Sequence, residues 1–418
     1  MAMEDGNLTA ELRKAIQSIV EKEHFIKHTV EKRLLAPDGC SFMGTLREVT
    51  IRGETISGHK DLHLFIKTII PNSHLQIYNI PEAYDKETFA YKDLFKVFNE
   101  IQREYSVPLI EKFVTIKCYD ESDSSAIIME NLRKRGFTTC DRMEIMPLKF
   151  AKLAVMQLAK FHGLSIVLKV KRPDYFIKKL RPLKVPFTYG EDSWTNFVDN
   201  LSNLGLSCLE GDAKKRVEKY IPTTFEKYKI YTTDPGSMRC LVHGDYRLNN
   251  IMARYTVSKT SLCKLYARLA GNFKSSLKIT INFSLFRKKH MEYLKELYHS
   301  TMSSFLSYFD MDVEDHYPKK EFQRLFRERL DFGLMFSLWY VPVILSVKVI
   351  RTYYISCLCP QKGPLHDIYK SPCNLTLYIP QKQSYYQLSI ITLSRLYRRS
   401  LYFVFKSLYR VLWKICNL

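Results

Sequence analysis

The residues best suited to do chemistry lie in one short segment, RCLVHGDYRLNNIMARY, at residues 239–255. A short apolar run ends in His243-Gly244-Asp245, and Asn250 follows five residues after the aspartate. At this spacing, a carboxylate can accept the proton of a reacting hydroxyl while a downstream amide oxygen ligates Mg²⁺, an arrangement typical of phosphoryl transfer. The simpler alternative is a turn after a strand, in which Asp245 and Asn250 hydrogen-bond the local backbone.

A hairpin that carries a lysine is predicted well before this segment. The runs EVTIRG and DLHLFIKTII are rich in β-forming residues, and GETISGHK separates them, so two strands are expected with Lys67 in the second. Residues 10–35 have a charged amphipathic helix pattern, and residues 81–105 have a second helical pattern. Residues 116–132 return to strand character, with an apolar run that ends at Met129. These elements predict a small, β-rich N-terminal lobe.

The chain after Asn131 is mainly helical in pattern. FAKLAVMQLAKFHGLSIVL has apolar residues at three- and four-residue spacing, and Gly163 lies near the end of this stretch. Residues 290–345 contain two further helical patterns. The apolar run at 332–347 contains Pro342 and is shorter than the roughly 20 residues that cross a bilayer, so we expect a buried helix. The prediction is a second, helical lobe that carries the His-Gly-Asp loop.

Several motifs, taken in order, resemble one group of small-molecule kinases. They are DLHLFIKT, AYDKETFAYKDLF, IIMENLRKRGF, LAKFHGLS and HGDYRLNNIM, and the similarity covers residues 10–255 and 290–345. The chain resembles the choline and aminoglycoside phosphotransferase superfamily, most closely the CHK kinase-like group that includes ecdysteroid kinases. The resemblance implies an α+β, protein-kinase-like fold with a small β-rich N-lobe and a larger helical C-lobe. It also implies transfer of a phosphoryl group from ATP, with Mg²⁺, to the hydroxyl of a small alcohol.

Carried over residue by residue, the resemblance assigns roles to the candidate site residues. Lys67 is expected to hold the ATP phosphates and Glu87 to pair with it, because a lysine neutralises phosphate oxygens only when its position is restrained. The resemblance places His243 and Asp245 in the catalytic loop, with Asp245 as the general base and Asn250 on the metal ion. Without the family pattern, Lys67 and Glu87 would be taken for solvated charges.

The resemblance also assigns the remaining contacts of the nucleotide. DGCSFMGTLREV occupies the place of the phosphate-covering turn, where Gly39 and Gly44 allow the backbone to approach closely. We expect a packed, structural role for His162, which matches a helix histidine of the pattern. The connection between the lobes, whose backbone is expected to meet adenine, consists of Met129, Glu130, Asn131 and Leu132.

The second metal-binding acid of this family has no clear counterpart. The pattern requires an Asp, in an Asp-Phe-Gln motif soon after the catalytic loop, to hold Mg²⁺ against the phosphates. Residues 256–290 contain no Asp or Glu, and the nearest match, INFS, puts Asn282 in that place. An amide oxygen can ligate Mg²⁺ but adds no charge. Two explanations stay open: a degenerate kinase, or intron or read-through sequence in place of the exon that encodes the acid.

The net charge of +21 is concentrated in two segments. Residues 256–290 carry eight Lys or Arg and no acid, and residues 346–418 carry eleven against one Asp, so the remainder is nearly balanced. We expect an N-terminal nucleotide-binding lobe at 1–131, a helical lobe at 132–345 in which 256–289 are atypical, and a basic tail at 346–418. The tail fits a basic amphipathic helix on an anionic membrane surface, although a solvated tail is the simpler interpretation.

The composition excludes disordered and fibrous proteins, because 46% hydrophobic and 13% aromatic residues can build a core. The first residues show no signal or transit pattern, and the ten cysteines lack metal-site spacing, so we expect a cytoplasmic protein with free thiols. Nucleic acid is not an expected partner, because no recognition motif accompanies the charge. We expect a monomer that binds a small-molecule alcohol. The alternatives are an inactive pseudokinase that acts as a binding module and a peripheral protein that uses the tail.

Overall fold

The computed structural model describes most of the chain. The described residues are 8–35, 44–69, 79–140, 146–183, 209–233, 240–255 without 242 and 247, 262–265, 284–335, 338, 375–379 and 384–388, with 196, 198–199, 202–203 and 205–206. The chain separates into two compact units, of which the first comprises 1–188, 229–282 and 286–330 and the second 189–228, 283–285 and 331–418. All the predicted site residues belong to the first unit. The boundaries expected at residues 131 and 345 stay predictions.

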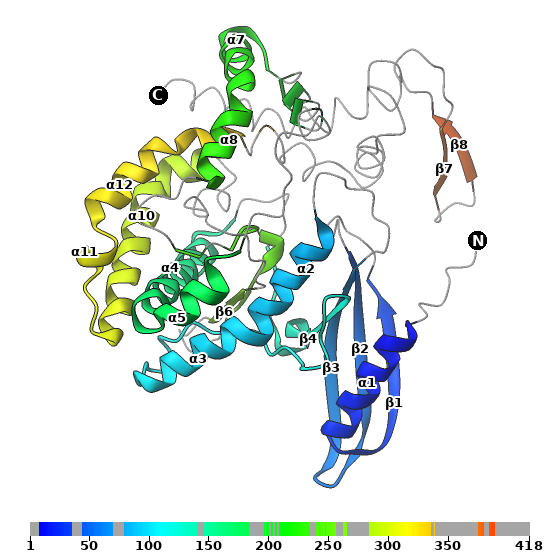
Figure 1. Cartoon of the computed structure of the whole chain (residues 1–418). Helices are drawn as coiled ribbons and strands as arrows, with labels where there is room; N and C mark the ends of the chain where they lie inside the picture. Colours follow the sequence, from blue (N-terminus) through cyan, green and yellow to red (C-terminus); the bar gives the residue numbers. More distant parts are fainter. Residues whose placement is uncertain are drawn as a thin grey trace. The chain divides into compact units, whose positions relative to one another are not determined.

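The N-terminal part of the first unit contains an antiparallel sheet (Figure 1). Its strands, hydrogen-bonded in this order, are β1 (Phe25–Leu34), β2 (Gly44–Thr55), β3 (Gly58–Ile69) and β4 (Ala126–Glu130). The predicted hairpin is confirmed as β2 and β3, and Gly58 in its turn has a φ of 104°, which glycine adopts without strain. Residues 117–119 lie along the other edge of β4, where Cys118 pairs with Met129.

The helix α1 (Ala10–Lys22) covers one face of this sheet. It begins after the N-cap Thr9, whose hydroxyl accepts a hydrogen bond from the backbone N–H of Leu12 at 3.2 Å. Apolar side chains from the helix and the sheet form one buried cluster between them. Its members are Leu8, Leu12, Ile16, Ile19, Val20, Val49, Ile51, Leu64, Ile66, Tyr119, Ala126 and Ile128.

The helix predicted over residues 10–35 was wrong beyond Lys22. His24 adopts a positive φ of 58°, which ends the helical conformation. The residues FIKHTVEKRL that follow are paired with β2 along the whole of β1, with Val30 opposite Ile51. Pairing with a neighbouring strand has overridden the local helical pattern, as tertiary context often does.

The register of β2 and β3 sorts their side chains between the two faces of the sheet. Val49 pairs with Leu64, and both belong to the cluster beneath α1. Leu46 pairs with Lys67, which lies three residues after Leu64 along β3. Because successive side chains of a strand alternate between its faces, Lys67 lies on the opposite face from Leu64. Lys67 is therefore directed away from α1.

A long helix follows β3 in the first unit, which confirms the helical pattern of residues 81–105. It consists of α2 (Ile80–Phe89), a π-helical turn (Ala90–Leu94) and α3 (Phe95–Glu104). Asn79 caps α2, since its side-chain oxygen accepts a hydrogen bond from the backbone N–H of Glu82 at 3.1 Å. The apolar face of α3, which includes the fully buried Phe98, packs into the main core.

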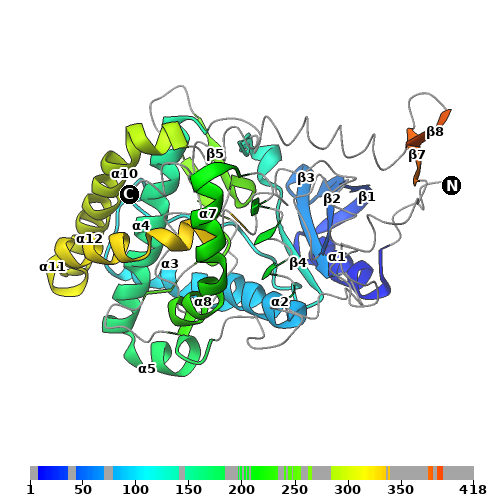
Figure 2. The same ribbon diagram turned by 90° about the horizontal axis from the view of Figure 1, so that it is seen from above.

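The remainder of the first unit is mostly helical. Its core helix α4 (Leu148–Lys171) lies beside α10 (Ser284–Leu306), as Figures 1 and 2 both show. The helix continues past Gly163, where a Cβ atom would lie 3.1 Å from the ring of Phe305, so glycine lets the two helices approach closely. Among the described helices, α4 alone is long and apolar enough to span a membrane, and 72% of its apolar window is buried, as expected for a core helix.

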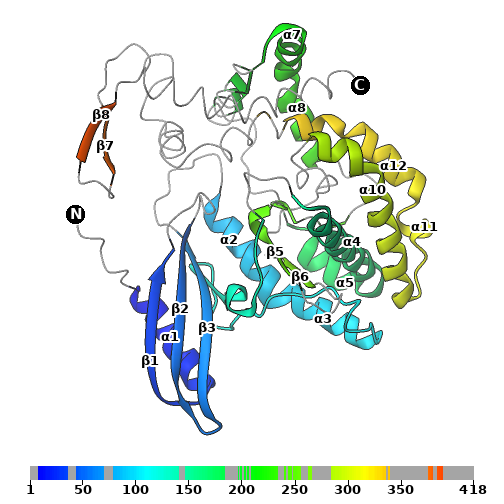
Figure 3. The same cartoon turned by 180° about the vertical axis from the view of Figure 1, so that it is seen from behind.

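A short hairpin follows the predicted catalytic loop. β5 (Ile251–Arg254) pairs with β6 (Leu262–Leu265), with Ile251 opposite Leu265 (Figure 3). A small antiparallel sheet followed by a mainly helical remainder confirms the α+β, two-lobed fold class. The other described α-helices are α5 (Pro173–Tyr175), α7 (Gly211–Tyr220), α8 (Thr224–Thr233), α11 (Val313–His316) and α12 (Lys319–Glu328).

The second unit has its own contacts. The ammonium of Lys227 pairs with the carboxylate of Asp331 at 2.8 Å, and the ring of Tyr228 stacks on that of Phe332. In the tail, β7 (Leu375–Ile379) pairs with β8 (Ser384–Leu388), a hairpin that the charge pattern had not indicated. Within the apolar run at 332–347, the described residues are buried as expected at Phe332, Leu334, Met335 and Leu338.

Candidate active site

The structure brings Lys67 and Glu87 together. Lys67 lies near the end of β3 and Glu87 lies on α2, and the Lys67 ammonium forms an ion pair with the Glu87 carboxylate. Only 9% of Lys67 and 5% of Glu87 are exposed to solvent. Charged side chains are rarely buried to this degree unless they are paired, because each must lose its hydration. The ion pair thus holds the Lys67 ammonium in a restrained, buried position at the end of the sheet.

A third residue, Tyr84, contacts this ion pair and was missed in the sequence. The ammonium of Lys67 lies 4.7 Å from the centre of the Tyr84 ring, within the range of a cation–π interaction. The Tyr84 hydroxyl donates a hydrogen bond to the backbone oxygen of Thr68 at 3.2 Å. Tyr84 precedes Glu87 by three residues, so both side chains project from one face of α2. Only this spacing could have pointed to Tyr84.

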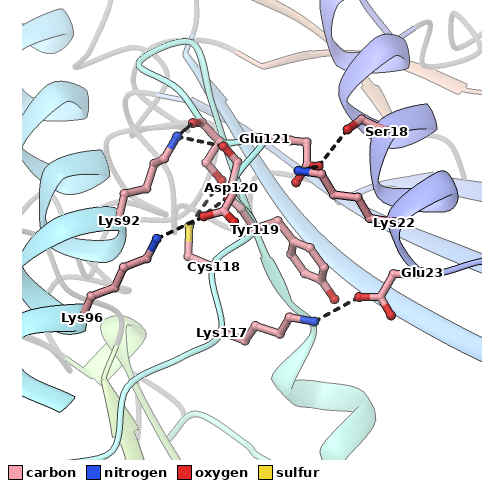
Figure 4. Close-up of polar contacts among 11 residues, drawn as sticks. Ser18, Lys22, Glu23, Lys92, Lys96, Lys117, Cys118, Tyr119, Asp120 and Glu121 are labelled. Carbon is pink, nitrogen blue, oxygen red and sulfur yellow. Dashed lines mark hydrogen bonds and ion pairs between the residues drawn. The ribbon is translucent and has the colours of Figure 1, made fainter. Parts of the chain in front are cut away.

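The helix that carries Glu87 is tied to the turn between residues 119 and 126 (Figure 4). The ammonium of Lys92 donates to the backbone oxygens of Asp120 at 2.8 Å and Ser122 at 2.6 Å. Lys96 pairs with the carboxylate of Asp120 at 3.2 Å. On its other side, the turn is held by α1, because Lys22 pairs with Glu121 at 2.8 Å. The two hydrogen bonds of Lys92 tie the helix to this turn and so help to hold Glu87 beside Lys67, while the exposed pair of Lys96 with Asp120 adds little.

In the catalytic loop, the structure brings Asp245 and Asn250 together. The side-chain N–H₂ of Asn250 donates to a carboxylate oxygen of Asp245 at 2.8 Å and to its backbone oxygen at 2.9 Å. Gly244, with a φ of 77°, allows the sharp bend before the aspartate. Because the nitrogen of Asn250 is committed to Asp245, the amide can offer only its oxygen to a metal ion. The backbone contact also fits the simpler interpretation of a local turn.

The catalytic loop is anchored on the core helix α4. The backbone N–H of Leu241 donates to the hydroxyl of Ser165 at 3.1 Å, and the hydroxyl of Tyr246 donates to the backbone oxygen of Ala154. His243 is 1% exposed, and its Nδ1 accepts a hydrogen bond from the backbone N–H of Asp245 at 3.3 Å. This contact gives His243 a part in shaping the loop, whereas a direct part in catalysis stays a prediction.

His162 lies in the core on α4, in keeping with the structural role expected for it. Its Nδ1 is 2.7 Å from the hydroxyl of Tyr298 on α10, and its residue is 5% exposed. Burial, and to a lesser extent the nearby His243, lowers the pKa of His162 to about 3. The imidazole is therefore neutral at physiological pH and contributes packing and one hydrogen bond between two helices.

The connection between the lobes is held from several sides. The backbone N–H of Asn131 donates to the backbone oxygen of His63 at 2.9 Å, which ties the connection to β3. The Asn131 side chain donates to the carboxylate of Glu48 at 3.1 Å, and Arg33 pairs with the same carboxylate at 3.0 Å. A short 3₁₀ turn follows at Leu132–Arg135. An aspartate at 131 would repel Glu48, which gives a reason for asparagine here.

Of the two glycines assigned to the phosphate-covering turn, Gly39 lies outside the described residues and Gly44 is the first residue of β2. A Cβ atom on Gly44 would lie 2.0 Å from the hydroxyl oxygen of Tyr84 and 2.6 Å from the backbone oxygen of Thr68. Real Cβ atoms do not approach other atoms so closely, so any side chain at this position would displace its neighbours. Close packing beside Lys67 thus requires glycine at 44 whether or not a nucleotide binds.

The described residues suit ATP better than they suit Mg²⁺. Lys67 provides a buried, restrained cation for phosphate oxygens, which fits a nucleotide. Within the described ranges, no group of three or more His, Cys, Asp or Glu side chains could hold a metal ion. In the sequence, the next acid after β6 is Glu292, and Asn282 lies outside the described residues. Among the residues that the structure describes, the donors near Asp245 are its own carboxylate and the neutral amide oxygen of Asn250, a set that does not fit a typical Mg²⁺ site.

A sheet lysine paired with a helix glutamate, followed by a catalytic loop with Asp and Asn, defines the class of protein-kinase-like folds. The model of the ecdysteroid kinase-like family matches residues 38–311, and the chain belongs to this family. The resemblance found in the sequence is thereby confirmed. Residues 256–290, which contain no Asp or Glu, fall inside the matched range.

The solved structures that match this chain include small-molecule kinases. The Plasmodium vivax ethanolamine kinase is 14% identical, with 79% of this chain and 81% of that chain covered and a TM-score of 0.36. A glucosamine kinase in complex with glucosamine, ADP and inorganic phosphate is 11% identical, with 81% of this chain and 94% of that chain covered and a TM-score of 0.30. No match was found among curated proteins. The family match alone carries the assignment.

Proposed function

We propose that this chain binds ATP at Lys67 and transfers its γ-phosphoryl group to the hydroxyl of a small alcohol, either ecdysteroid-like or choline-like. The buried ion pair of Lys67 and Glu87 carries the proposal. Burying such a pair costs folding free energy that apolar residues of the same size would not cost, so the pair has a purpose other than stability. Within a kinase-like family, that purpose is to hold a cation for phosphates.

Asp245 is the proposed general base of the reaction. As the alcohol oxygen bonds to the γ-phosphorus, its proton passes to the Asp245 carboxylate, and the bond from the γ-phosphorus to the bridging oxygen of ADP breaks. Asn250 holds the carboxylate through its N–H₂ group and so fixes its orientation. Lys67 stabilises negative charge on the phosphates as the bond breaks. The reaction therefore requires an acceptor that presents a hydroxyl to Asp245.

The sequence between Asn250 and Glu292 makes this turnover slow. It contains no Asp or Glu, so this segment supplies no carboxylate of the kind that the family uses to hold Mg²⁺ against the phosphates. Electrostatic stabilisation of the transferred phosphoryl group is among the largest contributions to such catalysis. We expect a rate at least about a thousandfold below that of a family member with the acid.

The second candidate is a catalytically inactive pseudokinase that binds a nucleotide and acts as a binding or regulatory module. The same lack of an acid in this segment favours it. The two candidates differ in turnover only, because both keep Lys67 and Glu87. Nucleotide binding therefore cannot separate them, and a chemical product must be measured.

The experiment measures ATP consumption by the purified full-length chain with a pool of steroid and amino-alcohol acceptors, with Mg²⁺ present and absent. Asp245→Asn is the matched control, because it keeps the shape and the hydrogen bond to Asn250 but removes the base. Acceptor-dependent consumption that the control abolishes supports the kinase. Consumption no greater than in the control, by a folded chain that binds ATP, leaves the pseudokinase. A folded chain that binds no ATP refutes both.

A further inference from the structure

Two neighbouring side chains of α2 contact the ammonium of Lys67, and only one of them carries a charge. Glu87 is the counter-ion, whereas Tyr84 presents its ring 4.7 Å from the same nitrogen. We propose that Tyr84 is a positioning residue for phosphate binding, which restrains Lys67 without neutralising it. This inference rests on the proposed function, because it requires that Lys67 binds the phosphates of a nucleotide.

The position of the Tyr84 ring is fixed by the ends of two strands. Tyr84 is 1% exposed, and its hydroxyl donates to the backbone oxygen of Thr68, the residue next to Lys67. On the β2 side, the hydroxyl lies where a side chain on Gly44 would have to be. Thr68 in turn is held by Arg47, whose Nη1 donates to its hydroxyl at 2.8 Å. The ring therefore cannot move without moving the strand ends.

A ring suits this place better than a second carboxylate would. The face of an aromatic ring carries partial negative charge and attracts a cation, most strongly where water is excluded. It carries no net charge, so it leaves the attraction between Lys67 and an incoming phosphate almost unchanged. The Glu87 carboxylate already balances the charge of Lys67, so a second carboxylate would make the site net negative and repel the phosphates. Tyr84 thus adds restraint while the net charge offered to the ligand is kept.

A role limited to packing makes a different prediction. If Tyr84 only filled the core, its loss would affect every ligand of the site to the same extent, including one without phosphates. If it positions Lys67, its loss weakens ATP and spares adenosine, because adenosine has no phosphate to meet the ammonium. The ratio of the two dissociation constants therefore isolates the proposed role.

The experiment measures the dissociation constants of ATP and adenosine by calorimetry on the full-length chain. Tyr84→Leu removes the ring and the hydroxyl, and Tyr84→Phe removes the hydroxyl alone. The matched control is Phe98→Leu, which creates a cavity in the core at a position 14 residues after Tyr84 in the same long helix. If Tyr84→Leu does not fold, Tyr84→Met takes its place, since an unbranched thioether adapts to irregular space.

We expect Tyr84→Leu to bind ATP about tenfold more weakly, within the range of a desolvated cation–π contact, with little change for adenosine. Phe98→Leu should keep the wild-type ratio, whereas Tyr84→Phe, which keeps the ring but loses its hydrogen bond to Thr68, should lie between the wild type and Tyr84→Leu. Equal weakening of ATP and adenosine, or unchanged ATP binding by Tyr84→Leu, would overturn the inference alone. If the wild-type chain binds ATP no more tightly than adenosine, the result would instead refute the proposed function at Lys67, and the role of Tyr84 with it.

Discussion

Removing one charge of the Lys67–Glu87 pair should cost more stability than removing both. The side chains are 11% and 6% exposed, so solvent screens neither charge and the values for buried pairs apply. In Glu87→Gln, the ammonium stays buried without a counter-ion, and the free energy of unfolding should fall by about 3–5 kcal/mol. For a unit of this size, with an unfolding entropy of about 2.1 cal/mol/K per residue, that corresponds to a fall in Tm of roughly 5–8 °C.

The double variant Lys67→Met/Glu87→Leu replaces both charges with apolar groups of similar length. No unpaired charge is left in it, so we expect it to unfold at a higher temperature than either Lys67→Met or Glu87→Gln. The control is Lys96→Met, in the same long helix as Glu87. It breaks the ion pair between Lys96 and Asp120. Those side chains are 61% and 68% exposed, and the loss of so exposed a pair should leave Tm nearly unchanged.

Thermal unfolding followed by circular dichroism, with all variants at one concentration and pH, measures these differences. The reasoning depends on strong coupling between the two charges. A double variant whose loss of Tm equals the sum of the losses in Lys67→Met and Glu87→Leu alone would show that the charges do not interact. A Lys96→Met variant as unstable as Glu87→Gln would show that burial does not set the cost.

Three further predictions concern other parts of the chain. Gly44→Ala should lower Tm and weaken ATP binding, because its Cβ would meet the Tyr84 hydroxyl at 2.0 Å. Adding Tyr84→Phe should restore part of the Tm and part of the ATP affinity, and no restoration would contradict the packing argument. Because burial lowers the pKa of His162 to about 3, the unfolded chain binds a proton below about pH 6.5 that the folded chain does not, so stability should fall as pH drops from 6.5 towards 3. The slope contributed by His162 is at most about 1.4 kcal/mol per pH unit, and unfolding measured against pH should become flatter in His162→Asn, whereas an unchanged slope would remove His162 as the cause. Truncation after Leu345 should abolish any binding to anionic vesicles in a flotation assay, since the whole basic tail is lost, and binding that survives must involve another surface.

The fold class and the pairing of Lys67 with Glu87 could be anticipated from the order of motifs along the chain. In each case the family pattern supplied what local propensity could not. Residues 25–34 demonstrate the limit, because their helical spacing predicted a helix and the available edge of β2 made them a strand. Strand pairing is a long-range effect that a pattern within ten residues does not contain.

The sequence predicted the charged residues of the candidate site. It did not predict the residues that hold them in place. Nothing in the sequence relates Tyr84 to Gly44, and their contact appears only when α2 packs on the end of the sheet. The same is true of Lys92, whose partners are backbone oxygens and therefore leave no trace in residue type. The role of Asn250 was expected towards a metal ion, whereas the described contacts of its nitrogen are with Asp245.

The two halves of the candidate site differ in how far apart along the chain their partners lie. Lys67 and Glu87 are 20 residues apart, so a short loop closure suffices to bring them together. The contacts that anchor the catalytic loop join residues 76 and 92 positions apart, at Leu241–Ser165 and Ala154–Tyr246, and His162 meets Tyr298 across 136. Closing longer loops costs more chain entropy and slows folding. During synthesis, the cation for the phosphates can thus be in place while the ribosome has yet to supply the residue that takes the proton.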